Sequence, residues 1–237
     1  MWKVRWIVCL TLLAAIAVWA DEPWRDKAYQ SWSANDVKRI LNNSPWARQA
    51  AVPSDWNLPG HQGLEVGTRV RIGKYPSNED DVPNQTRNPI TSFILRWQSS
   101  RTIRAALARE KVQRGAASAG STEKAVEREP EMYEIVLVVT DTTVRFPDAD
   151  EFQMRHDSWL DLKRTGRRIH TARVEIRRAP NRRINEVAFF FPKKLANGEP
   201  SIPPDEEQAD FNWSVGGTNI RADFKLSKMR DKTGLDL

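Results

Sequence analysis

Hydrophobic and polar residues alternate along the C-terminal part of the chain, which is typical of strands with one buried face. The alternation is longest around Gly216-Gly217, a dipeptide that suits a tight turn between paired strands. We therefore predict an antiparallel hairpin over 209–227. Its inward row consists of Phe211, Trp213 and Val215 before the turn and of Ile220, Ala222, Phe224 and Leu226 after it. Arg221 and Lys225 belong to the outward row, where we predict little contribution to stability.

Shorter patterns predict the remaining strands. A period of two residues indicates strands over 66–72, 172–177 and 187–191, each with one apolar row. Residues 93–97 form a further short strand. The run at 135–139 is apolar at every position, so it is predicted to be a central strand that is covered on both faces.

Two short helices are predicted near the start of the chain. Ser33, with Asp36 three residues later, resembles a capping box and predicts a helix over about 34–42. Pro45 is well placed in a first helical turn, and it predicts a second short helix that runs to Ala51.

Two further helices are predicted in the middle of the chain. Ser99 or Ser100 caps an amphipathic helix that continues to about Gln113. Residues 148–163 carry apolar side chains at roughly helical spacing, and Gly166 follows as a stop signal.

Helices dominate the early part of the chain and strands dominate the late part, which favours an α+β fold over a doubly wound sheet. The expected architecture has short N-terminal helices, one mid-chain amphipathic helix and a mainly antiparallel sheet with a C-terminal hairpin. A run of small residues predicts a flexible linker near 115–125. We still expect residues 21–237 to form a single domain, because the strands predicted before the linker need partners.

The N-terminal segment has the pattern of a secretory signal. Lys3 and Arg5 precede an almost wholly apolar run over residues 7–20. A helix that spans a membrane needs about 20 apolar residues, so this run suits a signal peptide better than an anchor. We predict that residues 1–20 are cleaved before Asp21; an uncleaved anchor is the alternative. No second long apolar run follows, so no membrane span is expected after cleavage.

Composition restricts the possible chemistry. The 237 residues include 37 Lys and Arg against 31 Asp and Glu, and removal of Lys3 and Arg5 leaves 35 against 31, a net charge of +4. Such a mildly basic chain permits contact with anionic envelope surfaces. The single cysteine, Cys9, lies in the leader. The mature chain therefore has no disulfide, no cysteine nucleophile and no cysteine metal site.

No motif for nucleotide binding, zinc hydrolysis or a serine nucleophile is present, so we predict no catalytic residue, no metal ligand and no cofactor. His156 beside Asp157 is the alternative, as a general base, although an exposed or hydrogen-bonded histidine is the commoner role. The acids at 148–151 suggest calcium, but an EF-type loop needs glycine at its sixth position, where Gln153 stands. These acids suit the first turn of a helix.

A dense run of basic residues between 163 and 183 is the sharpest charge feature. The candidate site for an anionic ligand comprises Arg173, Arg177, Arg178, Arg182 and Arg183. A solvated strand face is the default interpretation, since Glu175 alternates with two of these arginines. The functional alternative is contact with an anionic glycan or lipid headgroup. Nucleic acid is not expected as a partner, because no aromatic residue is interleaved for base stacking.

Tryptophans offer a second candidate site, because an indole face can stack on a sugar ring. Trp32, Trp46 and Trp56 lie close together in the sequence, beside prolines and short helices. Packing in the core is the usual role of such residues and remains the alternative.

Three pieces of the chain carry a resemblance to other proteins. They are Ser31-Trp32-Ser33 with Ser44-Pro45-Trp46-Ala47, Arg96-Trp97-Gln98-Ser99-Ser100 with 103–107, and 224–229 with Gly234. Together they resemble a group of uncharacterised exported proteins of the Acidobacteria, some of which are assigned a Gly-Trp-x-Thr-Asp domain. The motif of that domain is absent here. The resemblance implies export and a single folded unit, and it implies no activity, cofactor or catalytic residue.

These observations predict an exported envelope protein, located in the periplasm or outside the cell, that acts as a non-catalytic interaction or structural module. Its expected partners are an envelope protein or anionic glycan or lipid headgroups. The alternative is a glycan-active or glycan-binding enzyme that uses Asp, Glu, Arg and Trp residues.

Overall fold

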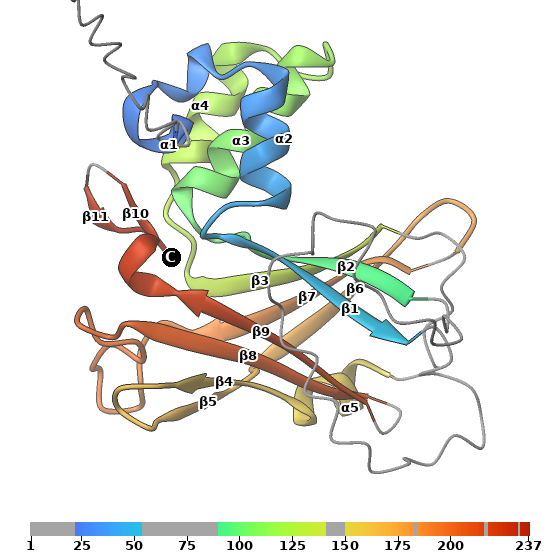
Figure 1. Ribbon diagram of the computed structural model, residues 1–237, viewed down its shortest axis with the longest axis vertical. Coiled ribbons are helices and arrows are strands. Elements are labelled where there is room, and N and C mark those ends of the chain that lie inside the picture. The colour runs from blue at the N-terminus through green and yellow to red at the C-terminus, as the bar shows by residue number, and fades with distance from the viewer. Residues whose placement is uncertain (1–21, 54–89, 141–149, 183, 216–217, 232) are drawn as a thin grey trace, which may run out of the picture.

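The computed structural model describes residues 22–53, 90–140, 150–182, 184–215, 218–231 and 233–237 (Figure 1). The predicted signal peptide, the strand predicted at 66–72, Trp56, Arg183 and the turn residues Gly216-Gly217 lie outside the described residues.

Two antiparallel sheets face each other and enclose the core (Figure 1). The five-stranded sheet has the order β1 (Ala47–Pro53), β2 (Ile90–Trp97), β3 (Met132–Val139), β7 (Ile184–Pro192) and β6 (Arg173–Arg178). The four-stranded sheet has the order β5 (Arg168–His170), β4 (Ser158–Leu162), β8 (Gln208–Val215) and β9 (Thr218–Lys225). Aromatic side chains join the two sheets: the Phe189 ring lies 5.0 Å from Phe211 and 5.3 Å from Trp213, measured between centroids.

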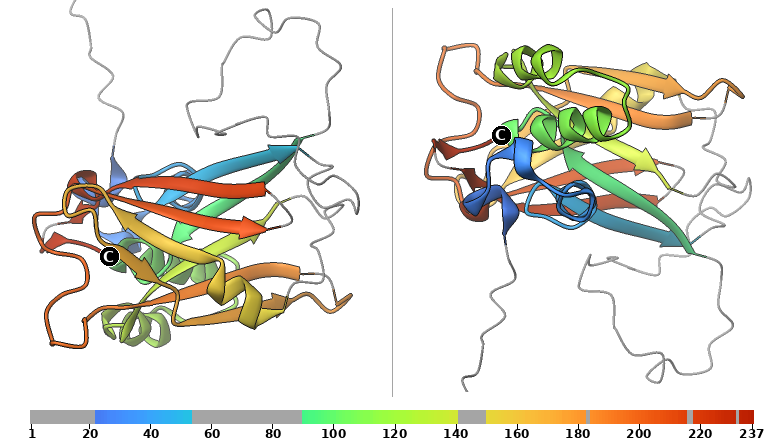
Figure 2. Two further views of the ribbon diagram at one scale, coloured as in Figure 1. Left: turned by 90° about the horizontal axis from the view of Figure 1, so that it is seen from below. Right: turned by 90° about the horizontal axis from the view of Figure 1, so that it is seen from above.

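Most of the helices gather at one end of this sandwich (Figures 1 and 2). They are α1 (Pro23–Asp26), the 3-10 turn η1 (Tyr29–Ser31), α2 (Ala34–Asn42), α3 (Arg101–Gln113) and α4 (Ala119–Glu127). Helix α5 (Glu151–His156) lies apart from them, next to β6. The predicted start signals are confirmed, because Ser33 and Asp36 form a capping box and the Ser100 hydroxyl accepts the N–H of Ile103.

The α+β class and the main strands are confirmed. β3 is the central strand of the five-stranded sheet, as its uniformly apolar sequence predicted. β8 and β9 form the predicted hairpin, with Trp213 opposite Ile220 and Phe211 opposite Ala222. All four of these residues are buried, so the alternating row faces the core.

The short helix predicted at 45–51 is wrong. These residues belong largely to β1, which pairs with β2 so that Ala50 lies opposite Phe93. Trp46, Ala47 and Ala50 are all buried. Pairing and burial in the tertiary structure therefore outweigh the local signal from Pro45.

The helix predicted over 148–163 is also wrong in its second half. Helix α5 ends at His156, and the strand β4 begins at Ser158. In β4 the buried residues alternate with half-buried ones, which is the period of a strand. Leu160 and Leu162 are two residues apart, so a strand puts both into the core.

Helix α4 occupies most of the segment predicted as a flexible linker. The Ser118 hydroxyl accepts the N–H of Ser121 and begins the helix. Thr122 and Val126 are buried, and α4 packs against α3. The guanidinium of Arg104 on α3 donates to the carbonyl of Val126 at the end of α4. The small residues of this segment therefore allow α4 to pack closely against α3, and they do not form the flexible linker that we predicted.

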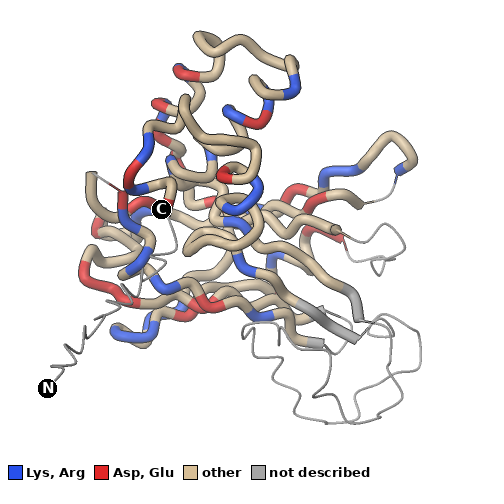
Figure 3. The backbone as a smooth tube through the Cα atoms, turned by 45° about the horizontal axis from the view of Figure 1, so that its top comes forward, with Lys and Arg blue, Asp and Glu red and all other residues tan. Residues whose placement is uncertain are grey.

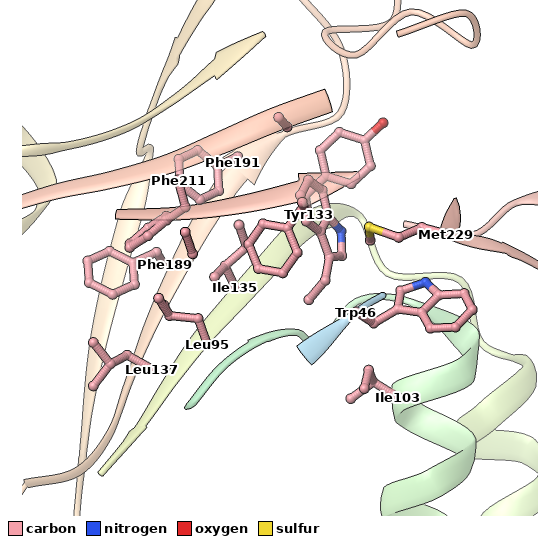
Figure 4. Packing of buried hydrophobic residues seen from close by; sticks show 14 of the residues in the cluster. Trp46, Leu95, Ile103, Tyr133, Ile135, Leu137, Phe189, Phe191, Phe211 and Met229 are labelled. Carbon is pink, nitrogen blue, oxygen red and sulfur yellow. The ribbon is translucent and has the colours of Figure 1, made fainter. Parts of the chain in front are cut away.

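The C-terminal tail connects the helical end of the molecule to the sheets through hydrogen bonds. It contains η2 (Leu226–Lys228), β10 (Arg230–Asp231) and β11 (Gly234–Leu235). The Asp236 carboxylate accepts the backbone N–H groups of Arg101, at 2.6 Å, and Thr102, at 3.0 Å, at the start of α3. The Trp46 indole donates to the Asp236 carbonyl at 2.7 Å. Figure 4 shows Trp46 beside Met229 and Ile103 in this part of the core.

Candidate functional site

Charged and polar side chains cover the outer side of the four-stranded sheet. We call this surface the polar face; its residues are Trp159, Asp161, Lys163, Arg168, His170, Gln208, Asp210, Asn212, Arg221, Asp223 and Lys225. In the left panel of Figure 2, which is seen from below, this sheet lies nearest the viewer and helices α1 to α4 lie behind it. Residues of both charge signs follow one another along the strands (Figure 3).

Strand register arranges these residues in rows that run across the sheet. One row consists of His170, Trp159, Asn212 and Arg221. The next row consists of Arg168, Asp161, Asp210 and Asp223. Neighbours in such a row lie close enough for their side chains to interact. Asp161 and Asp210 are therefore direct neighbours on paired strands.

Asp161 is held by several donors. Arg168 makes two hydrogen bonds to it, from Nε to Oδ1 at 2.8 Å and from Nη2 to Oδ2 at 3.2 Å. The Trp159 indole donates to Oδ2 at 2.9 Å, and Asn212 donates at 3.3 Å. Burial alone would raise the pKa of Asp161, but the bonds from Arg168 and Trp159 outweigh it and hold the pKa below its usual value. The Arg168 guanidinium also lies over the Trp159 ring, 4.5 Å from its centroid.

Asp210 lies deeper, with no exposed surface. Lys163 Nζ is 2.9 Å from its Oδ2, Gln208 donates to Oδ1 at 2.7 Å, and Arg221 pairs with Oδ2. Burial would raise the pKa of Asp210, but these three donors outweigh it and lower the pKa. We predicted that Arg221 contributes little to stability because it lies on the outward row. This contact is at odds with that prediction, because Arg221 pairs with the buried carboxylate of Asp210.

The paired carboxylates are poorly suited to glycoside hydrolysis. That reaction needs one carboxylic acid that remains protonated near neutral pH, and therefore a raised pKa. The pKa values of Asp161 and Asp210 are both lowered. The pair instead fixes the positions of Arg168, Lys163 and Arg221.

The side chains of these three cations remain partly exposed to solvent. The side chains of Lys163, Arg168 and Arg221 are 48%, 50% and 40% exposed, although each touches a carboxylate. Lys225 is exposed as well. A guanidinium has five N–H donors and an ammonium has three, so donors remain for an outside acceptor. The outer layer of the polar face is therefore suited to carboxylate, sulfate or phosphate groups.

The predicted arginine patch does not form a free cationic surface. The Arg177 guanidinium lies 2.7 Å from Glu134, 3.4 Å from Glu186 and 3.6 Å from Glu175. Arg173 is paired with Glu175 at 3.2 Å and lies over the Phe190 ring. These glutamates neutralise both arginines. They come from three strands, so their meeting depends on sheet register.

The other members of the predicted patch lie beyond β6 or at its end. Arg178 donates to the carbonyl of Arg182 at 3.2 Å. Arg182 is exposed and has a positive φ of 62°, as in a tight turn. Arg183 lies outside the described residues.

The predicted stacking tryptophans belong to the core. Trp32 and Trp46 are 3% and 0% exposed, and their indoles donate to the carbonyls of Pro23 and Asp236. Their faces are therefore not open to a sugar ring. Trp159, which the sequence analysis placed in a helix, is the half-buried tryptophan of the polar face. Its alternation with Leu160 and Asp161 was the signal that could have placed it there.

The remaining candidate chemistry has structural roles. His156 is largely exposed, with Nδ1 3.1 Å from Asp157 Oδ1 at the end of α5. The Asp150 carboxylate caps α5 by accepting the N–H of Gln153 at 2.7 Å. Within the described ranges no group of three or more His, Cys, Asp or Glu side chains is placed to hold a metal ion. No helix in the same ranges is long and apolar enough to cross a membrane.

Glu206 anchors the turn between β4 and β5, beside the polar face. The residue is 2% exposed, and its carboxylate accepts hydrogen bonds from the N–H groups of Arg164, at 2.7 Å, and Thr165, at 3.2 Å, and from the Thr165 hydroxyl. Burial alone would raise the pKa of Glu206, but these bonds outweigh it, so the pKa lies below 4.5.

We expect acid to weaken the fold through this group. A lowered pKa means that the ionised form stabilises the native state, so the contribution is present above pH 4.5 and is lost as the pH falls through the lower native value. Glu206→Gln should cost about 1–2 kcal/mol at pH 7 and make stability less dependent on pH below 4.5. Urea melts at several pH values test this, with the exposed Glu199→Gln as control. An unchanged pH slope in Glu206→Gln would contradict it.

The chain matches no protein-family model, and neither a curated protein nor a solved structure shows significant similarity to it. Its function is therefore inferred from the residues of the polar face.

Proposed function

We propose that the protein is an exported, non-catalytic module of the cell envelope that binds an acidic glycan through the polar face. The layer of partly exposed cations above ionised carboxylates carries this proposal. Export is proposed from the leader-like pattern of residues 1–20.

Charge supports an anionic ligand. The polar face has four cations, Lys163, Arg168, Arg221 and Lys225, against three acids, and one of these, Asp210, is buried beneath Lys163 and Arg221. Lys163 and Arg221 therefore lie between a ligand and the Asp210 carboxylate, and the exposed cations outnumber the partly exposed acids Asp161 and Asp223. Because Asp161 and Asp210 already hold three of the cations in place, little side-chain freedom is lost on binding.

The shape of the surface supports an extended ligand. Four neighbouring strands present their side chains over one sheet, without a helix of the described chain in front of them (Figure 2). A polymer with regularly spaced carboxylates can contact several rows at once. Hydroxyl groups of a sugar also suit the half-buried Gln208 and the exposed His170, which donate or accept hydrogen bonds. The lowered pKa values of Asp161 and Asp210 disfavour the alternative of a glycan-cleaving enzyme.

Affinity for polygalacturonate, a polymer of carboxylated sugars, tests the proposal, with neutral dextran as the comparison. We expect binding at low ionic strength that weakens steeply as salt is added. The double substitution Arg168→Gln, Lys225→Gln should weaken binding about tenfold. It should also lower the slope of log affinity against log salt concentration by about the amount expected for two ionic contacts. Arg173→Gln, Arg178→Gln removes the same charge from the other sheet and should have little effect.

Three results would contradict the proposal: no retention at low salt, retention that salt does not alter, or an equal loss in both double variants. Binding to anionic lipid vesicles without binding to polygalacturonate would replace the glycan with a lipid headgroup as the ligand.

A further inference from the structure

A pocket of about 240 Å³ lies among the helices, far from the polar face. Its walls come from the segment containing α1 and η1, from α3 and α4, and from Asp231 of β10. Helices α1 to α4 stand at one end of the molecule and the four-stranded sheet at the other (Figure 1). The pocket is therefore separate from the site of the proposed function.

Aromatic rings form the apolar part of this pocket. Trp24, Tyr29 and Trp32 all line it, and the Tyr29 and Trp32 rings meet edge to face with centroids 6.3 Å apart. The Trp24 ring already holds one cation, since the Arg39 guanidinium lies 5.8 Å from its centroid. Aromatic faces attract cations, and quaternary ammonium ions in particular.

The carboxylates of Glu123 and Glu127 give the pocket a negative electrostatic potential. Glu123 and Glu127 lie one turn apart on α4 and line the pocket, and neither forms an ion pair with a cation of the described chain. The two cations in the lining are already paired. Lys27 Nζ is 3.5 Å from Asp36, and Arg101 Nη1 is 3.8 Å from Asp231.

The negative charges of Glu123 and Glu127 also act on the Tyr29 hydroxyl. Burial, followed by the charges of Glu123 and Glu127, raises the pKa of Tyr29 above its usual value. A tyrosine hydroxyl is protonated at neutral pH, so that of Tyr29 can donate to a carboxylate or a ligand.

We propose that this pocket binds a small organic ammonium ion between the half-buried ring of Tyr29, which Trp32 supports from behind, and the exposed carboxylates of Glu123 and Glu127. The rings and the carboxylates attract the same charge, and the native cations do not neutralise this pair of glutamates. A ligand that also carries a hydroxyl can accept a hydrogen bond within the pocket.

Titration of the full chain with choline tests this inference, with 3,3-dimethyl-1-butanol as a neutral molecule of nearly the same shape. Tryptophan fluorescence and calorimetry report binding, because two tryptophans line the pocket. We expect choline to bind about tenfold or more tightly than the alcohol, as a cation–π contact and two carboxylates imply.

Variants locate the binding. Glu123→Gln, Glu127→Gln should weaken choline binding about 3- to 30-fold. Glu131→Gln changes an exposed acid outside the pocket lining and should leave it unchanged. Equal binding of choline and the alcohol, preference for butyrate, or no effect of the double substitution would overturn the inference.

The two proposals fail independently. Arg168→Gln, Lys225→Gln should bind choline normally even where it no longer binds polygalacturonate. A loss of choline binding in this variant, with its melting temperature unchanged, would also overturn the inference, because it would place the cation site elsewhere.

Discussion

Replacing Phe224 by alanine is expected to lower the free energy of unfolding by about 3–5 kcal/mol, the cost of lost burial and of a cavity. Phe224 has no exposed surface, and its ring meets Trp97 of the opposite sheet edge to face, with centroids 5.2 Å apart. The side chain therefore joins β9 to β2. Thermal or urea melts measure the change.

Lys225 provides the matched control for this variant. It follows Phe224 in β9 but is exposed, so Lys225→Ala should cost less than about 0.5 kcal/mol. A Phe224→Ala variant that melts like the parent protein would show that the hairpin does not pack in the core.

Replacing Arg221 by alanine is expected to cost about 1.5–3 kcal/mol, which is much more than its position on an outward row predicts. The substitution leaves the fully buried Asp210 with Lys163 as its remaining cation. The cost stays below that of a fully buried pair because the Arg221 side chain is 40% exposed.

A double-mutant cycle separates the interaction free energy between Arg221 and Asp210 from other effects of replacing Arg221. In an Asp210→Asn background the buried charge is absent, so Arg221→Ala should cost less than about 1 kcal/mol. Additive costs in the cycle would show that Arg221 and Asp210 do not stabilise each other.

Strands with one clear apolar row could be predicted from the sequence. The alternation around 211–226 predicts β8 and β9 because an apolar residue occupies every second position, and Phe211, Trp213, Ile220 and Phe224 of this row are buried. Helix starts at Ser33 and Ser100 were predictable for a similar reason, since a capping hydroxyl acts within one turn. Both features depend on interactions that are local in the sequence.

Elements that depend on distant partners were missed. Residues 47–53 form a strand because β2 lies beside them, although β2 begins at Ile90. Residues 158–162 carry both helical and strand spacing, and pairing with β8 selects the strand. The small residues near 115–125 suggest a linker, but α3 supplies the surface against which α4 packs.

The position of the candidate site could not be predicted from the sequence. The arginines predicted to bind an anionic ligand include Arg173 and Arg177, whose charges are neutralised by glutamates of β6, β3 and β7. Composition cannot show which arginine faces a glutamate and which faces solvent. That distinction requires the register of β6 with β7 and of β4 with β8.

The contact between Trp46 and Asp236 bears on how quickly the chain folds. These partners are separated by 190 positions, and the same tail caps α3. Contacts between residues so distant in the chain require costly loop closure, and chains dominated by them reach the native state slowly. We expect the sheets to assemble before the helical end closes. Until the tail arrives, the start of α3 would lack the Asp236 carboxylate that accepts its first N–H groups.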